Sequence, residues 1–292
     1  LKKNLITPSY ITPEMKALDK ECKANGVFIL NELGLDPGID HMSAMKIIDG
    51  IKAKGGEIER FESFTGGLIA PQSDTNPWSY KFTWNPRNVV LAGQGSAATF
   101  LQNGKYKFVP YNKLFSRTKE IEIDSYGFFE GYANRDSLSY IEVYGLTGIP
   151  TIYRGTLRRK GYSEAWNTFV QLGCTDDSYV LPDTENMTYR EYINSFLPYH
   201  TELTVEKKLQ DSLGVSNEVM NKLMWLGVFE HKKIGIKGLS PAKVLQKKLE
   251  EKWSLEPSDK DLIVMYHKFS YYLNGESFDI VSSLAVEGED QT

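Results

Sequence analysis

The 292-residue sequence contains only two cysteines, Cys22 and Cys174, too few for a disulfide framework or a cysteine-rich metal site. Its four histidines are widely spaced, and none forms an H-x-x-H motif or a His/Cys cluster. We therefore expect no metal site. Two cysteines without a disulfide framework are typical of a cytoplasmic protein with reduced thiols.

Long apolar runs are also missing. No run approaches the roughly 20 residues that a membrane helix needs, and the first residues lead into no apolar segment typical of a signal peptide. The formal net charge of −4 argues against a nucleic-acid partner, because phosphate backbones select clustered positive charge. An anionic small substrate remains compatible with this charge, since two well-placed arginines make a pocket locally positive.

Several sequence patterns that often signal chemistry are absent or incomplete. There is no G-x-S-x-G motif of a serine hydrolase. Residues 93–98 match G-x-G-x-x-A, but Asn103-Gly104 follows within one or two turns and no second parallel strand appears, so we predict a simple strand, turn and helix here. The apolar stripe of residues 216–229 superficially resembles a helix-turn-helix, but without a basic stripe it is better explained as a packing face.

The first 56 residues contain one strand-and-helix unit. Thr12-Pro13-Glu14 is a helix start, with a capping threonine, proline in the first position and an acid facing the dipole. Val27–Leu30 predicts a parallel strand buried on both faces, and a Gly/Pro loop leaves it. Asp40 is expected to cap the next helix, which should stop at Gly55-Gly56. Because one such unit cannot make a Rossmann-type domain, residues 1–40 are predicted to be the end of a larger dinucleotide-binding domain.

From about residue 57 the pattern changes to short strand candidates separated by turns rich in glycine, proline and asparagine. The candidates 119–129, 138–145 and 149–158 predict a mixed or antiparallel sheet rather than βαβ repeats. Helices are predicted at 161–172 and within 204–253, where Ser216 starts one helix and Ser240-Pro241 starts another. Paired strands are predicted at 262–266 and 278–281. The expected class is α/β: an α+β domain with a mixed sheet, carrying remnants of a Rossmann-type domain.

Two arginine-containing segments are candidates for carboxylate recognition. Asn134–Ser137, with Arg135, lies where two strand candidates meet, and Gly155–Arg158 ends another strand. The planar fork of arginine binds carboxylates in bidentate fashion, and a neighbouring glycine lets a ligand approach the backbone. From the residues alone, an anion site and an ordinary surface ion pair both remain open.

Five motifs, in order, resemble segments of the saccharopine dehydrogenases of the glutamate-forming type. They are Gly34–His41, Ser63–Pro71, Tyr80–Pro86, Tyr132–Ser137 and Arg154–Tyr162. The sequence departs from the family pattern at Thr65, where cysteine is usual, and at Ile69, where proline is usual.

This resemblance implies a Rossmann domain into which a larger substrate domain is inserted. Residues 41–286 would be the substrate-binding and dimerisation domain, and residues 287–292 the start of the return to the dinucleotide-binding domain. The implied protein is a cytoplasmic homodimeric oxidoreductase of lysine metabolism, which interconverts saccharopine with L-glutamate and α-aminoadipate semialdehyde using NADP(H). Without the phosphate-binding half of its cofactor site, the chain alone is expected to be inactive.

The resemblance also implies site residues. Those expected to bind substrate are Ser9, Tyr10, Asp36, Arg135, Thr156, Leu157 and Arg158. Those expected to bind NADP are Thr65, Gly66, Gly67 and Trp84. Asp36 would be the catalytic residue that holds the charged amine or iminium, while Arg135 and Arg158 would together clamp substrate carboxylates. His41, Tyr10 and a water molecule all remain open as the general base.

Two other functions remain open. A related imine reductase could make carboxynorspermidine, but the far end of that substrate is cationic and needs acids instead of a second arginine. The domain could also be a non-catalytic dimerisation module.

Overall fold

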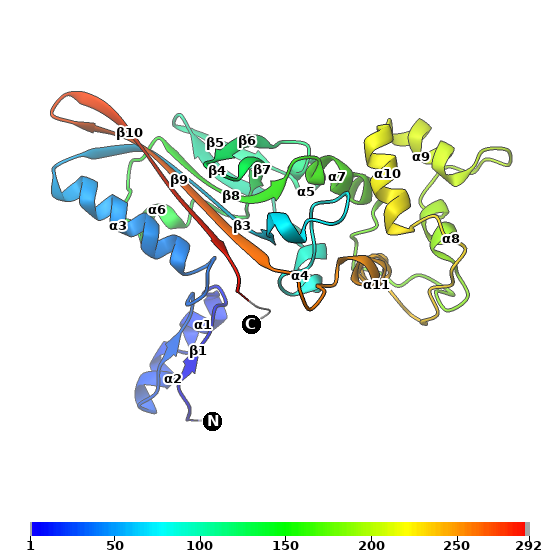
Figure 1. The fold of residues 1–292 in the computed structure, drawn as a ribbon. Coiled ribbons are helices and arrows are strands. Elements are labelled where there is room, and N and C mark those ends of the chain that lie inside the picture. Colours follow the sequence, from blue (N-terminus) through cyan, green and yellow to red (C-terminus); the bar gives the residue numbers. More distant parts are fainter. Residues whose placement is uncertain (1, 290–292) are drawn as a thin grey trace.

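Figure 1 shows a computed structural model of the protein, which describes residues 2–289. Its centre is an eight-stranded sheet in which neighbouring strands follow the order β10-β9-β3-β8-β4-β5, while β7 pairs with both β6 and β8. β3 and β8 run parallel, and the other strand pairs described in this sheet are antiparallel. The predicted α/β class with a mixed sheet is therefore confirmed.

The strands of this sheet are β3 (Glu57–Ile69), β4 (Ala98–Gln102), β5 (Lys105–Val109), β6 (Lys119–Ile123), β7 (Gly127–Ala133), β8 (Thr151–Arg159), β9 (Asp261–Leu273) and β10 (Glu276–Glu287). β3 is buried along both faces because β8 and β9 flank it and helices cover the sheet. The hairpin of β9 and β10 confirms the paired strands predicted near the end of the chain.

Helix α3 (Ile39–Ala53) covers one face of the sheet, with the short helix α6 (Tyr140–Val143) beside it (Figure 1). We call this face of the sheet the α3 face. Side chains at helical spacing, Ala44, Ile48 and Ile51, form a small core with Phe61, Ile152 and Phe269 of the strands. The helix ends near Gly55-Gly56, as its sequence predicts.

A larger core contains Phe64 and Leu157, which alternate to the opposite face of the sheet, and extends among the remaining helices. These are α4 (Pro86–Val90), α5 (Tyr111–Leu114), α7 (Tyr162–Leu172), α8 (Tyr189–Asn194), α9 (Val205–Leu213), α10 (Asn217–Leu226) and α11 (Pro241–Trp253), with a 3-10 turn, η1, at Pro71–Ser73. Ser216 and Ser240 accept backbone hydrogen bonds as N-caps, so the helix starts predicted there are confirmed.

The first residues form a small lobe that projects from the sheet beside the N-terminal end of α3 (Figure 1). It consists of β1 (Leu5–Ile6) and β2 (Ile29–Leu30), which pair in parallel, and of α1 (Pro13–Ala17) and α2 (Asp19–Ala24). Thr12 caps α1 as predicted. The predicted burial of residues 27–30 is wrong within residues 2–289: Leu30 is 47% exposed, because β1 is its only neighbouring strand there.

Three local predictions are corrected by the structure. Residues 86–90 are helix and 98–102 strand, so the segment around 93–98 is a helix, turn and strand, the reverse of the predicted order. Residues 140–143 are helical, because Asp136 accepts the backbone N–H of Leu138 and turns the chain before it can extend. Asp40 lies in the first turn of α3 and is not its cap.

The domain boundaries can be placed on this fold. Residue 40 lies just inside α3, and the predicted domain 41–286 contains the whole large sheet except the last residue of β10. Glu287 still belongs to β10, and residues 290–292 of the predicted return segment lie outside the described residues. Within 2–289, no helix is long and apolar enough to cross a membrane.

Candidate functional site

Strand register places several of the predicted site residues on the α3 face. Thr65 of β3 pairs with Thr156 of β8, and Thr156 pairs in turn with Tyr132 of β7. Because side chains alternate along a strand, Arg158 and Gly67 share this face with them. Four of the predicted substrate and cofactor residues of the sheet therefore form one strip: Thr65, Gly67, Thr156 and Arg158.

Leu157 and Gly66 alternate to the opposite face. Leu157 is fully buried in the larger core, and a Cβ added at Gly66 would lie 3.0 Å from the Leu157 Cβ. The side chain of Leu157 therefore packs in the core, and only the backbone of this residue is on the side of the predicted site. Its carbonyl oxygen accepts a hydrogen bond of 2.8 Å from Nη1 of Arg158.

Arg158 is a buried cation that pairs with no acidic side chain within the described residues. Its side chain lies against the rings of Tyr80, Tyr162 and Tyr132, whose centroids are 5.1, 5.3 and 6.0 Å from the guanidinium carbon. The residue is 2% exposed, and its Nε has no hydrogen-bond partner. Among residues 2–289, no carboxylate oxygen lies within 4.0 Å of its guanidinium nitrogens. Burying an unpaired charge costs several kcal/mol, so this geometry is typical of a site that receives an anion.

Arg135 lies in a different environment from Arg158. It follows β7 with a left-handed backbone (φ 42°), its side chain is exposed, and its guanidinium carbon is 5.8 Å from the ring centroid of Tyr10. No direct contact joins the two arginines in the described part of the chain. Their joint role as a clamp stays a prediction.

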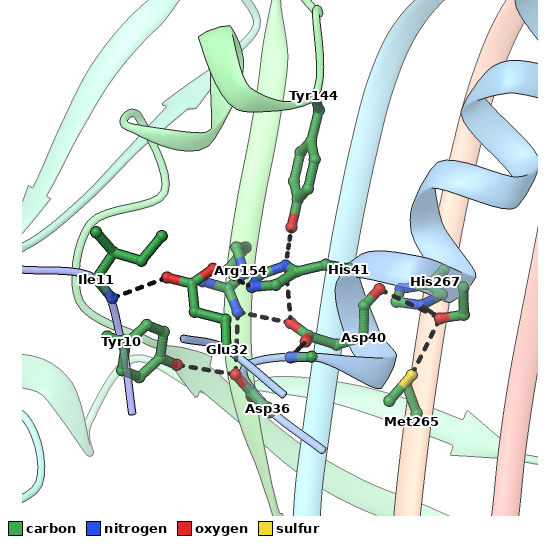
Figure 2. A network of polar contacts seen from close by, with 12 residues as sticks. Tyr10, Ile11, Glu32, Asp36, Asp40, His41, Tyr144, Arg154, Met265 and His267 are labelled. Atoms are coloured by element: carbon green, nitrogen blue, oxygen red, sulfur yellow. Dashed lines mark hydrogen bonds and ion pairs between the residues drawn. The ribbon is translucent and has the colours of Figure 1, made fainter. Parts of the chain in front are cut away.

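Asp36 is the centre of a polar network between the N-terminal lobe, α3 and the sheet (Figure 2). Its Oδ1 accepts the Tyr10 hydroxyl at 2.9 Å and Nη2 of Arg154 at 3.0 Å. The same Nη2 donates to Oδ2 of Asp40 at 2.8 Å. Burial raises the pKa of the Asp36 carboxyl, while the charge of Arg154 opposes that rise.

His41 and Tyr10, the two candidate bases, both lie in this network. His41 Nδ1 is 2.6 Å from the Tyr144 hydroxyl, and its Nε2 is 3.4 Å from Glu32 Oε2. Burial lowers the pKa of His41, which favours the neutral ring that a base needs. Burial and the Asp36 charge raise the pKa of Tyr10, so its phenol stays protonated near neutral pH and is a donor.

A second histidine borders the network on β9. The Oγ atom of Ser43, in α3, lies 2.5 Å from His267 Nε2 and 3.3 Å from the sulfur of Met265. Burial lowers the pKa of His267 to about 4, so the ring is neutral. Within the described range, no group of acidic, histidine and cysteine side chains is arranged to hold a metal ion.

The residues predicted to face a cofactor lie mainly near one edge of the strip. Thr65 is buried, whereas Trp84 is 46% exposed. A Cβ added at Gly67 would lie 3.2 Å from Thr83 Oγ1 and 3.9 Å from the Trp84 ring, so Gly67 keeps the backbone open at this point. Ser9 lies apart in the N-terminal lobe, where its hydroxyl accepts a hydrogen bond from Thr7 Oγ1 at 3.1 Å.

The sequence-based prediction missed Arg154 and Asp40. Arg154 is 5% exposed and stacks over the ring of Tyr140 at 4.2 Å. A signal was present: Arg154 and Arg158 are four residues apart in one strand and must share a face. Asp36 and Asp40 flank the start of a helix, which would bring two acids close together if the loop turned tightly.

Comparison with known proteins identifies the family. Residues 34–292 match the family model described as saccharopine dehydrogenase C-terminal domain. The chain is 36% identical to mitochondrial alpha-aminoadipic semialdehyde synthase of Mus musculus, over 95% of this chain and 31% of that protein. It is also 36% identical to saccharopine dehydrogenase [NADP(+), L-glutamate-forming] of Pyricularia oryzae, over 92% of this chain and 61% of that protein.

A solved structure agrees with these matches. The apo structure of saccharopine dehydrogenase (L-Glu forming) from Saccharomyces cerevisiae superposes with a TM-score of 0.84 at 30% identity, covering 98% of this chain and 66% of that one. The chain thus spans between about a third and two thirds of the length of these relatives. It belongs to the saccharopine dehydrogenase family, through the C-terminal domain of that family.

Proposed function

We propose that the chain is the substrate-binding part of an NADP-dependent, L-glutamate-forming saccharopine dehydrogenase of lysine metabolism. It would interconvert saccharopine with L-glutamate and α-aminoadipate semialdehyde. The names of the Pyricularia oryzae and Saccharomyces cerevisiae relatives support this reaction. The observation that carries the proposal is Arg158, a buried cation with no described acid beside it.

The chemistry of saccharopine suits the two charged regions of the strip. Saccharopine has three carboxylates and one secondary amine. A carboxylate beside Arg158 would neutralise the buried guanidinium, and Arg135 is available to a second one near Tyr10. The protonated amine would lie near Asp36, whose charge favours a cation there. Carboxynorspermidine has a cationic far end and only one carboxylate, so it could not pair both arginines.

NADP is the cofactor that we propose. When bound, NADP(H) supplies or accepts the hydride at the carbon next to the nitrogen. Thr65, Gly67 and Trp84 would hold its nicotinamide end, because Gly67 leaves the backbone open there and Trp84 presents an exposed ring. The Trp84 ring would also exclude water from that edge of the site.

We also propose that residues 1–40 are the end of a dinucleotide-binding domain. α1 and α2 have no buried residues, and apolar side chains of both strands of the lobe are exposed. A two-stranded parallel sheet with uncovered apolar faces is not stable alone, because parallel sheets need cover on both sides. Additional strands and helices of that domain would supply the cover.

A homodimer in a reducing compartment such as the cytoplasm completes the proposal. β10 is an edge strand with exposed apolar side chains, including Val281, Leu284 and Val286, and an exposed apolar edge is a ready template for pairing with another chain. Cys22 and Cys174 are both free thiols, which suits reducing conditions. Sedimentation of the full-length protein would give the mass of two copies if this is right.

The function is tested by following NADPH formation in full-length protein given saccharopine and NADP. We expect turnover with saccharopine and none with carboxynorspermidine under the same conditions. Arg158→Met should abolish saccharopine turnover, whereas the exposed control Arg117→Met should leave it unchanged. Turnover of carboxynorspermidine instead would favour the imine reductase, and no turnover of either would favour a non-catalytic module.

A further inference from the structure

Arg154 connects three parts of the fold at the proposed site. It projects from β8 on the α3 face, two residues before Thr156. Its Nη2 contacts Asp36 of the loop and Asp40 of α3, at 3.0 and 2.8 Å. Because the guanidinium is 5% exposed and stacked on Tyr140, it has little freedom to turn away.

The loop that carries Asp36 is closed tightly onto the start of α3. Gly34 donates its N–H to the Pro37 carbonyl at 2.9 Å and accepts the N–H of Ile39 at 3.0 Å. Gly38 donates to Asp40 Oδ1 at 2.7 Å, which leaves Oδ2 of Asp40 for Arg154. A Cβ at Gly38 would lie 2.1 Å from the Gly34 oxygen, so only glycine fits.

The two oxygens of Asp36 are used unequally. Oδ1 accepts both the Tyr10 hydroxyl and Arg154, whereas Oδ2 accepts no hydrogen bond within residues 2–289. The Asp36 side chain retains 16% of its exposure. One oxygen is therefore fixed by the protein, and the other is available to a ligand.

We propose that Arg154 is a positioning residue: held in place by Asp40, it keeps Asp36 ionised and turns the Asp36 Oδ2 toward the substrate amine. This inference rests on the proposed function. Arg154 itself touches no substrate: it acts through Asp36. A neutral or rotated Asp36 would lose the charge that holds the protonated amine for reaction.

Other charged and titratable groups face this pair from every neighbouring element. They are Tyr10 of the N-terminal lobe, Glu32 before the loop, Asp40 and His41 of α3, Tyr140 of α6 with Tyr144 directly after it, and His267 of β9. Arg154 is the cation that lowers the pKa of Asp36 most, whereas Asp40 raises it. Removing each partner should therefore move the titration of Asp36 in opposite directions.

The test compares Arg154→Met with Asp40→Asn in full-length protein. We expect the acid limb of the saccharopine kcat/KM profile to move to higher pH in Arg154→Met, by about one unit or more. In Asp40→Asn the acid limb should move to lower pH, because the negative charge of Asp40 is removed and Arg154 then pairs with the Asp36 carboxylate alone. In Arg154→Lys the acid limb should lie closer to its wild-type position, because the positive charge is kept. The exposed control Asp49→Asn should leave the profile unchanged.

A purely structural role would lower the rate at all pH values and leave the acid limb in place, which would overturn the proposal. Shifts in the same direction for both variants would overturn it as well. If Arg154→Met fails to fold, Asp40→Asn still gives the sign. The Asp36 carboxyl is also titrated by carbon-13 NMR, assigned by its loss in Asp36→Asn. This readout needs no turnover, so absence of saccharopine activity would reject the proposed function without deciding the role of Arg154.

Discussion

Replacing Arg158 with methionine separates the role of a ligand-binding arginine from that of a structural one. Methionine has a similar length and fills the same apolar space between Tyr80, Tyr132 and Tyr162. The substitution removes three ring contacts of about 0.5–1 kcal/mol each and one charged hydrogen bond of about 1.5–3 kcal/mol. It also relieves the several kcal/mol needed to bury an unpaired charge.

These effects nearly cancel, so we expect the free energy of unfolding of Arg158→Met to stay within about 2 kcal/mol of the wild type. Arg154→Met is the matched comparison. It leaves the carboxylates of Asp36 and Asp40 buried without their cation and should cost about 3–5 kcal/mol. Two arginines of one strand, both about equally buried, should thus differ clearly in stability.

Urea unfolding measures both variants, with a constant m value as the check that the midpoint reports stability. Calorimetry on full-length protein should show saccharopine affinity falling by roughly 100-fold or more in Arg158→Met, because a desolvated charged contact is lost. The reasoning would be refuted if Arg158→Met lost as much stability as Arg154→Met. Unchanged affinity would remove Arg158 from the binding site.

Three other substitutions test separate parts of the site. Arg135→Ala should raise the KM for saccharopine roughly 100-fold, since about 3 kcal/mol of charged hydrogen bonding would be lost; an unchanged KM would exclude Arg135. His267→Gln should flatten the acid dependence of stability. Unfolded His267 takes up a proton below about pH 6.5 and the folded ring only near pH 4, so the wild type loses about 3 kcal/mol through this window as pH falls. Equal slopes in urea titrations of wild type and variant would contradict this. Gly67→Ala should weaken NADP binding more than it weakens the fold, because its Cβ enters the space beside Thr83 and Trp84; fluorescence titration with NADPH would show it.

Features fixed by neighbouring residues could be predicted from the sequence. The helix starts at Thr12, Ser216 and Ser240 depend on hydrogen bonds that span three residues, and all three are confirmed. The mixed sheet followed from the spacing of strands and turns. The family resemblance pointed to Asp36 and Arg158, and the structure gives each of them an unusual environment.

The rest depends on contacts between distant residues. Arg154 meets Asp36 and Asp40 across separations of 118 and 114 residues, which no local pattern encodes. The structure has a helix at 140–143 where a strand was predicted. Asp136 accepts hydrogen bonds from the Leu138 backbone N–H and from the Thr99 hydroxyl of β4, and these turn the chain. The exposure of Leu30 depends on which strands lie beside it, and periodicity does not report that.

The position of β3 has a consequence for how the protein would move. Both of its edges are hydrogen-bonded, to β8 on one side and to β9 on the other, so releasing Thr65 would break two ladders at once. Its amides should be among the slowest to exchange with deuterium. We therefore expect any movement around the site to occur on the Asp36 side, while β3 stays in place.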